Sequence, residues 1–157
     1  MKIISTRRCN LRALNKKDFE ILITLYTNEE VRKYLGGVRS PENAWDSLYK
    51  HKYNFTVRLN KTKSIIGIIM IAPHHDSEDM EISYMFLPQF WGNGYATETV
   101  KAVLDFCKNE LKLNRVVSET QTANEYSCRL LEKIGYTAES KVERFGADQT
   151  IYVYNFN

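Results

Sequence analysis

The stretch EISYMFLPQFWGNGYATETV, residues 81 to 100, decides the fold class, because it sets three kinds of local structure in a row. Polar and apolar residues alternate at its start, which predicts a β-strand from Met80 to Leu87. A loop with two glycines follows. From about Ala96 to Leu111, apolar residues recur at the spacing of one helical face. The order strand, glycine loop, helix places the N-terminus of a helix directly after a tight turn.

The glycine loop has two interpretations. Glycines just before a helix allow a phosphate to approach the free N–H groups and the positive end of the helix dipole. Alternatively, the glycines only permit tight turning. Two familiar phosphate motifs do not fit, because no Lys-Ser/Thr pair follows Gly94 and Thr97 stands where a dinucleotide fingerprint has its third glycine or alanine. Spacing alone leaves both interpretations open.

Apolar periodicity divides the rest of the chain into further strands and helices. The predicted strands are Ile3 to Ala13, Phe55 to Leu59, Lys63 to Ala72, Arg115 to Thr120, Ser140 to Phe145 and Thr150 to Phe156. The predicted helices begin after Asn15, at Glu29 (to Leu35), after Ser40, and at Asn124 (to Ile134); the first places Phe19, Leu22, Ile23 and Tyr26 on one face. Helices mixed with a mostly antiparallel run of strands predict an α+β fold, and 157 residues fit one domain, 1–157.

Composition excludes several classes of protein. Hydrophobic residues make up 43% and charged residues 26%, as in ordinary globular proteins, and the net charge of +3 is too small to indicate nucleic-acid binding. No apolar stretch is long enough to cross a membrane. Three widely spaced cysteines predict no disulfide framework and favour a cytoplasmic location. His74-His75 has no further His or Cys at metal-ligand spacing, so no metal site is expected.

Three motifs resemble one known family. Residues 89–94, QFWGNG, fit the pattern Gln/Arg-x-x-Gly-x-Gly/Ala and resemble the acetyl-CoA-binding motif of the GNAT N-acetyltransferase superfamily. Residues 124–136, NEYSCRLLEKIGY, resemble the family's second signature. Residues 5–14, STRRCNLRAL, and 28–37, NEEVRKYLGG, are similar to the opening of its ribosomal-protein N-terminal acetyltransferase (RimJ/RimL-type) branch. These segments agree in order and spacing over nearly the whole chain, which makes the resemblance specific.

The resemblance implies a fold and a cofactor. The GNAT acyl-CoA N-acyltransferase fold is α+β, in α/β/α layers, with a mixed, mostly antiparallel sheet that splays between its fourth and fifth strands, here residues 80–87 and 115–120. Acetyl-CoA is the implied cosubstrate, with pantetheine in the splay and pyrophosphate on the backbone of residues 91–96. The residues expected to bind it are Phe86, Leu87, Gln89, Trp91, Gly92, Asn93, Gly94, Tyr95, Ala96, Thr97, Asn124 and Ser127.

The resemblance also implies direct transfer of an acetyl group to a primary amine, on a protein N-terminus or a small molecule. Ser127 is the expected donor to the departing thiolate; the alternative is a small residue that packs against the sheet. Glu81 is the expected general base, acting through water, and the alternative is a solvated charge. Glu143 is a second candidate base, although the sequence around it departs from the family pattern. Neither Cys107 nor Cys128 is expected to act as a nucleophile.

The acceptor and the activity itself have alternatives. At pH 7 a lysine-like amine needs about 4.6 kcal/mol for deprotonation and an α-amine about 1.4 kcal/mol, so an α-amine requires only a weak base. A catalytically silent CoA-binding regulatory module is the alternative function, and a nucleic-acid-binding protein is a third possibility that rests only on charge. A monomer and a homodimer are both compatible with the sequence.

Overall fold

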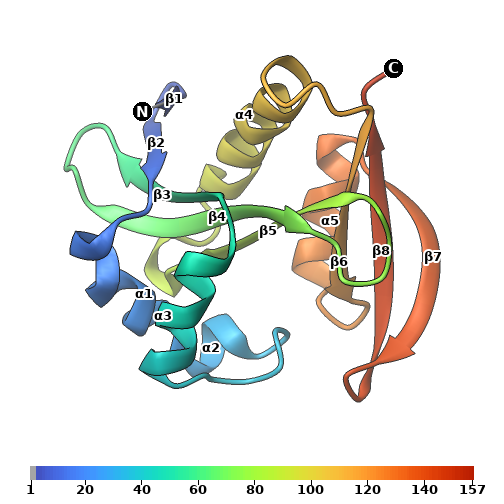
Figure 1. The fold of residues 1–157 in the computed structure, drawn as a ribbon, viewed down its shortest axis with the longest axis horizontal. Helices are drawn as coiled ribbons and strands as arrows, with labels where there is room; N and C mark the ends of the chain where they lie inside the picture. Colours follow the sequence, from blue (N-terminus) through green and yellow to red (C-terminus); the bar gives the residue numbers. More distant parts are fainter. Residues whose placement is uncertain (1–2) are drawn as a thin grey trace.

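The computed structural model describes residues 3–157, apart from the side chains of residues 47–50. Eight strands form one sheet in the order β1-β2-β3-β4-β5-β6-β8-β7 (Figure 1). The strands are β1 (Ile4–Ser5), β2 (Cys9–Ala13), β3 (Tyr53–Leu59), β4 (Ile65–Pro73), β5 (Met80–Phe86), β6 (Arg115–Gln121), β7 (Thr137–Arg144) and β8 (Ala147–Asn155). The α-helices are α1 (Phe19–Tyr26), α2 (Glu29–Arg32), α3 (Pro41–Lys50), α4 (Tyr95–Asn109) and α5 (Glu125–Ile134), and the short 3-10 helices are η1 (Lys16–Asp18) and η2 (Pro88–Phe90).

Helices cover both faces of the sheet. On one face α1, α2 and α3 lie together, and on the other lie α4 and α5 (Figure 1). Leu22 and Leu25 of α1 share a buried cluster with Met85 of β5, whereas Val100 of α4 and Leu131 of α5 belong to the larger core on the opposite face. The predicted α+β fold with α/β/α layers is therefore confirmed. None of the helices in the described part of the chain is long and apolar enough to cross a membrane.

The sheet splays between β5 and β6. These two strands run parallel and pair at a single position, Glu81 with Val117, while all other neighbouring strands in the sheet are antiparallel. One further link, from Ser118 Oγ to the carbonyl of Ile82 at 2.7 Å, lies beside this pair. Beyond it the strands separate, which confirms the predicted splay and opens a space between the ends of β5 and β6.

The helix that follows the glycine loop forms as predicted. Val100, Val103, Leu104 and Cys107 are all buried, so the apolar stripe of α4 does face the core. The predicted helix starts also agree with the structure, because side-chain oxygens of Asn15, Ser40 and Asn124 accept backbone N–H groups at the starts of η1, α3 and α5.

Some element boundaries were wrong. The strand predicted from Ile3 to Ala13 is two strands, β1 and β2, that pair with each other across a turn at residues 6–8. The helix predicted to reach Leu35 ends at Arg32, before two glycines with positive φ. Both C-terminal strands begin earlier than predicted, at Thr137 and Ala147, and form one long antiparallel pair. Hairpin pairing between neighbouring strands sets the strand boundaries, and the backbone conformation near Gly36 and Gly37 accompanies the early end of α2.

The buried face of α1 also differs from the prediction. Leu22, Leu25 and Tyr26 are buried there, whereas Phe19 and Ile23 are only partly buried. The Phe19 ring instead meets the Trp45 ring of α3 edge-on, with centroids 4.8 Å apart. A second helix alongside α1 thus covers part of the apolar face that periodicity predicted.

Position 67 in β4 has room for glycine but not for a larger residue. A Cβ at this position would lie 2.5 Å from the carbonyl oxygen of Met85 and 2.7 Å from a ring carbon of Phe86, both in β5. We expect Gly67→Ala to lower the free energy of unfolding by about 2–3 kcal/mol, because overpacking against backbone cannot be relieved by turning a side chain. Urea denaturation measures this change. An unchanged midpoint at an unchanged m-value would show that β4 and β5 separate more easily than their close contact indicates.

Candidate functional site

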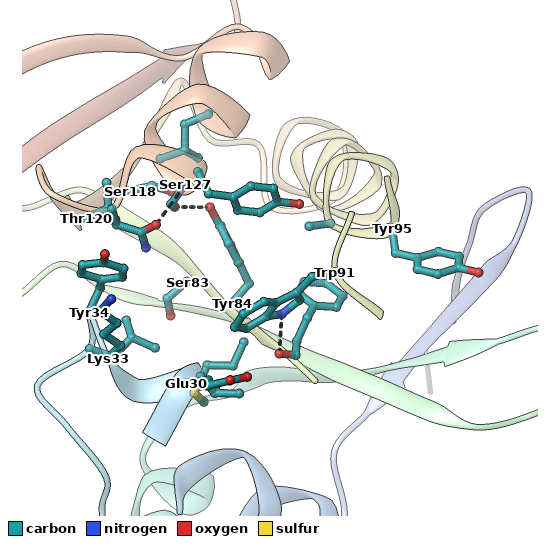
Figure 2. A pocket seen from close by; sticks show the side chains of 18 of the residues that line it. Glu30, Lys33, Tyr34, Ser83, Tyr84, Trp91, Tyr95, Ser118, Thr120 and Ser127 are labelled. Carbon is teal, nitrogen blue, oxygen red and sulfur yellow. Dashed lines mark hydrogen bonds between the residues drawn. The ribbon is translucent and has the colours of Figure 1, made fainter. Parts of the chain in front are cut away.

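A cleft of about 510 Å³ opens where β5 and β6 diverge. Its walls come from the ends of these two strands, the segment after α2, the glycine loop and the start of α5 (Figure 2). Most of the lining is apolar, and a few polar groups point into it. Among the residues predicted to bind the cofactor, the lining includes Phe86, Trp91, Gly92, Gly94, Tyr95, Ala96, Asn124 and Ser127. Leu87, Gln89, Asn93 and Thr97 lie in the same segments but outside the lining of the cleft.

The glycine loop has the conformation that only glycine adopts readily. Gly92 and Gly94 have φ angles of +79° and +80°, and Gly94 is the residue at which α4 starts. The Asn93 side chain donates to the carbonyls of Phe90 and Trp91, which holds the loop closed on itself. The first helical hydrogen bond of α4 runs from the N–H of Glu98 to Gly94, so the N–H groups just before Glu98 have no carbonyl within the helix. This geometry suits an anion.

Glu98 points away from this loop, toward the N-terminal strands. Its carboxylate accepts hydrogen bonds from Thr6 Oγ1 at 2.6 Å, the N–H of Arg8 at 2.9 Å and Nε of Arg8 at 2.7 Å. Partial burial opposes ionisation of Glu98, but these hydrogen bonds outweigh it and lower the pKa of the carboxyl. The Arg8 guanidinium also stacks on the Tyr95 ring at 4.3 Å. The turn at residues 6–8 therefore fastens the start of α4.

A hydrogen-bonded pair of hydroxyls lies inside the cleft. Tyr84 OH of β5 and Ser127 Oγ of α5 are 2.6 Å apart (Figure 2). Burial raises the pKa of Tyr84 to about 12, so the phenol keeps its proton at any physiological pH. Ser127 is itself buried. Tyr84 and Ser127 both belong to the lining of the cleft.

Asn124 caps the start of α5. Its Oδ1 accepts the backbone N–H of Ser127 at 3.2 Å and so caps α5. Asn124 also lines the cleft. Because the cap uses only the oxygen, the amide nitrogen is left to act as a donor toward a ligand.

Trp91 is in the cleft and not in the core. The indole is 44% exposed, and its Nε1 donates to the carbonyl of Phe86 at 2.8 Å, at the end of β5 (Figure 2). The ring therefore forms part of the wall beside the point where the strands separate.

Arg32 holds the wall that faces the glycine loop. This buried side chain donates to the carbonyls of Leu35 and Gly37, and its Nη1 lies 3.6 Å from the sulfur of Met85. The segment held by these hydrogen bonds contains Tyr34 and Leu35, which line the cleft. The hydrogen bonds of the Arg32 guanidinium therefore fix the conformation of the loop after α2, which is neither helix nor strand.

The carboxylates predicted as general bases lie in different places. Burial raises the pKa of Glu81, although a hydrogen bond at 2.9 Å from the N–H of Glu119 opposes the rise. Glu81 is outside the cleft lining, whereas Glu119 of β6 is in it, with its side chain 6% exposed. Glu143 is exposed on β7 and is also outside the lining.

Sequence reasoning missed Glu119 and the groups around it. Its Oε1 lies 2.8 Å from Nε2 of His74 and 3.3 Å from Nε2 of His75, and its Oε2 lies 2.9 Å from Nε of Arg144. These partners come from two separate parts of the chain, the loop after β4 and the end of β7. Glu119 follows the buried Val116, Val117 and Ser118 in the strand RVVSETQ, and this position was the only signal in the sequence.

The thiols are poorly placed for chemistry. Burial raises the pKa of Cys107 to about 12, which keeps this thiol protonated. Cys128 is only partly buried, but its sulfur faces the carbonyls of Gln121 and Thr122 at 3.9 Å. Neither cysteine lines the cleft between β5 and β6.

Comparison with known proteins agrees with this architecture. The family model described as "Acetyltransferase (GNAT) domain" matches residues 8–137. A Bacillus subtilis (strain 168) protein named "Uncharacterized N-acetyltransferase YoaA" is 31% identical over 156 residues, which cover 91% of this chain and 87% of the relative.

Solved structures extend the comparison to the fold. The crystal structure of a GNAT-family acetyltransferase from Bacillus anthracis has a TM-score of 0.86 at 27% identity, over 98% of both chains. Spermidine N-acetyltransferase from Vibrio cholerae, in complex with CoA and spermine, has a TM-score of 0.82 at 21% identity, over 94% of this chain and 95% of that one, and shows the fold alone. Taken with the splayed sheet and the glycine loop, these matches show that the chain belongs to the GNAT acetyltransferase family.

Proposed function

We propose that this protein transfers the acetyl group of acetyl-CoA directly to a primary amine, on a protein N-terminus or a small molecule. The proposal rests on one observation: three kinds of functional group line the same cleft. They are a glycine loop suited to an anion, a pair of hydroxyls and a carboxylate. These are the groups that an acetyl transfer needs for the cofactor phosphates, the leaving thiolate and the amine proton.

The cofactor enters along the splay in this proposal. Pyrophosphate lies on the N–H groups at the start of α4, where the loop of Gly92 and Gly94 lets it approach the backbone. Pantetheine follows the separated ends of β5 and β6, within reach of the Asn124 amide. Support for this cofactor comes from family membership and from the CoA in the Vibrio cholerae structure of the same fold.

Glu119 is the group that we propose takes the proton of the acceptor amine, directly or through water. Two carboxylates line the cleft, Glu30 and Glu119, but Glu30 is exposed to solvent, whereas the side chain of Glu119 is buried among cationic and hydrogen-bonding groups. Glu81, the base favoured by the sequence, lies outside the cleft lining, and its carboxylate accepts the backbone N–H of Glu119. We therefore propose that Glu81 helps to position Glu119.

Ser127 and Tyr84 stabilise the departing thiolate as a pair: one hydroxyl donates to the other, and the second donates its single proton to the thiolate. Full transfer of a proton from a phenol of pKa about 12 to a thiolate of pKa about 8.5 would cost about 5 kcal/mol. Hydrogen-bond donation carries no such cost. The pair therefore acts on charge that develops in the transition state.

We also propose a branch of the family and a compartment. We propose the ribosomal-protein N-terminal acetyltransferase-like branch, on the motifs in residues 5–14 and 28–37. The cytoplasm is the proposed compartment, because Cys9, Cys107 and Cys128 are all free thiols.

Release of free thiol from acetyl-CoA tests the function. The panel of acceptors contains N-terminal peptides, aminoglycosides, polyamines and free amino acids. We expect turnover on one class of amine. Silence across the panel, with acetyl-CoA still bound, would contradict an acetyltransferase and favour the regulatory CoA-binding module.

Gly94→Trp is expected to weaken acetyl-CoA binding at least about tenfold, which corresponds to about 1.4 kcal/mol. The substitution places a bulky side chain at the loop and strains a φ of +80°. Gly146→Trp is the matched control, because Gly146 has a φ of +74° and open space around it, in the turn between β7 and β8. Isothermal titration with acetyl-CoA compares the two variants. Equal affinities would show that the loop of Gly94 is not the phosphate site.

A further inference from the structure

Two neighbouring histidines and one carboxylate converge at the edge of the cleft. Nε2 of His74 lies 2.8 Å from Oε1 of Glu119, and Nε2 of His75 lies 3.3 Å from the same oxygen. Each of the three residues offers one ligand atom, a ring nitrogen or a carboxylate oxygen, and these atoms all lie within 4.8 Å of one another. Ligands about 2 Å from a tetrahedral ion are separated by little more than 3 Å, so small side-chain movements suffice to surround one.

Contacts outside this group fix the orientation of its members. The carboxylate of Glu119 only accepts, so Nε2 of buried His74 carries the proton of their 2.8 Å hydrogen bond. A metal on Nε2 replaces this proton, and Ser77 Oγ, 2.8 Å from Nδ1, can then accept an Nδ1–H and hold the ring in the metal-binding tautomer. On the far side of Glu119, Arg144 lies 2.9 Å from Oε2 and turns Oε1 toward the histidines. Ser77 and Arg144 thus orient two of the three ligands, as outer contacts do in built metal sites, and the His75 ring packs on the His74 ring with centroids 4.7 Å apart.

The charges nearby are compatible with a divalent cation. Glu119 contributes one negative charge and the two imidazoles are neutral when they bind a metal. Arg144 adds a positive charge, but Asp76 lies 2.9 Å from its Nη1 and offsets it. A bound dication would therefore leave about one net positive charge, near the half-exposed His75.

We propose that His74, His75 and Glu119 form a site for a divalent transition metal of the zinc class. Two imidazole nitrogens and a single carboxylate suit Zn²⁺, Co²⁺ or Ni²⁺, whereas Mg²⁺ requires mostly oxygen ligands. Three protein ligands leave one position for water, and half of the His75 side chain is open to solvent.

A metal bound at this site would regulate acetyl transfer in the cleft. Glu119 lines the cleft, so a metal on Oε1 removes the carboxylate that we propose as the proton acceptor. This consequence rests on the proposed function, while metal binding itself does not. A micromolar metal would then inhibit acetyl transfer without weakening acetyl-CoA binding.

Titration of the purified full-length chain with Co²⁺ tests the site. We expect one ion per chain, with the visible absorption of tetrahedral Co²⁺ bound by nitrogen and oxygen, and displacement by Zn²⁺ but not by Mg²⁺. His75→Ala is the main variant, because this side chain is 44% exposed and its removal leaves the core intact. His51→Ala is the matched control, since His51 is the one histidine of the sequence outside the pair.

The expected result is a loss of affinity of at least about tenfold in His75→Ala, and a loss of roughly 10- to 100-fold in Ser77→Ala, which removes the orienting hydroxyl. His51→Ala retains full affinity. Equal affinity in His75→Ala and His51→Ala overturns the proposal. An intense near-ultraviolet charge-transfer band also overturns it, because it would show binding by cysteine sulfur. Circular dichroism confirms that each variant is folded, and acetyl-CoA affinity gives a readout that a correctly folded variant leaves unchanged.

Discussion

Replacing Glu119 by glutamine is expected to lower kcat for acetyl transfer by about 10²- to 10⁴-fold, the range that general base catalysis contributes. Glutamine keeps the size of the side chain and its ability to accept a hydrogen bond, but it cannot take a proton from the amine. The carboxylate lies in the lining of the cleft and is 6% exposed, so bulk water does not replace it freely. The affinity for acetyl-CoA should change little, because Glu119 is outside the glycine loop.

Glu81→Gln is the matched control for this prediction. Its side chain still accepts the N–H of Glu119, so the position of β6 is preserved. Burial raises the pKa of Glu81, and a group whose pKa is higher in the folded protein destabilises the fold as pH rises above its unfolded value. Glu81→Gln should therefore be at least as stable as the wild type at neutral pH. If it loses as much kcat as Glu119→Gln does, Glu81 is the base and the assignment to Glu119 is wrong.

Amines of different basicity provide a second readout for Glu119. A base matters most for an amine that is mostly protonated, since deprotonation at pH 7 requires about 4.6 kcal/mol for a lysine-like amine and about 1.4 kcal/mol for an α-amine. The loss in Glu119→Gln should thus be greater for the more basic acceptor. A loss independent of amine basicity would point to a structural role for this carboxylate.

Local patterns in the sequence were enough to predict the parts of the fold that depend on neighbouring residues. The stripe of Val100, Val103 and Leu104 follows from the helical repeat, and the positive φ angles of Gly92 and Gly94 agree with glycines placed before a helix. The motifs around these residues also led to the correct family. The finer assignment to the ribosomal-protein branch is still a prediction.

Long-range contacts account for what the sequence did not predict. Glu119 meets His74 across 45 positions of the chain, and no periodicity joins a loop to a strand at that separation. In the same way, the break between β1 and β2 depends on Glu98, which is 92 positions from Thr6. A carboxylate needs partners when it is buried, but the sequence does not say which ones. The candidate metal site escaped notice for this reason, because the His pair lacked its third ligand.

The hydroxyl pair in the cleft leads to the second large effect. Tyr84→Phe and Ser127→Ala are each expected to lower kcat by about 10- to 100-fold, because each removes a hydrogen-bond donor near the leaving thiolate. Tyr84 OH and Ser127 Oγ are 2.6 Å apart and act as one unit, so the double variant should lose much less than the product of the two single losses. Fully multiplicative losses would show that the two hydroxyls act independently.

The pH profile separates donation of a hydrogen bond from transfer of a proton. Because burial holds the pKa of Tyr84 at about 12, the phenol stays protonated and kcat should show no falling limb up to about pH 10. A falling limb in that range, lost in Tyr84→Phe, would show that Tyr84 is a true general acid with a much lower pKa in the complex with acetyl-CoA. Ser127→Thr keeps the hydroxyl and should retain more activity than Ser127→Ala, although its extra methyl group must fit at a buried position. Equal losses in the two Ser127 variants would mean that packing, and not the hydroxyl, is what the reaction needs at this position.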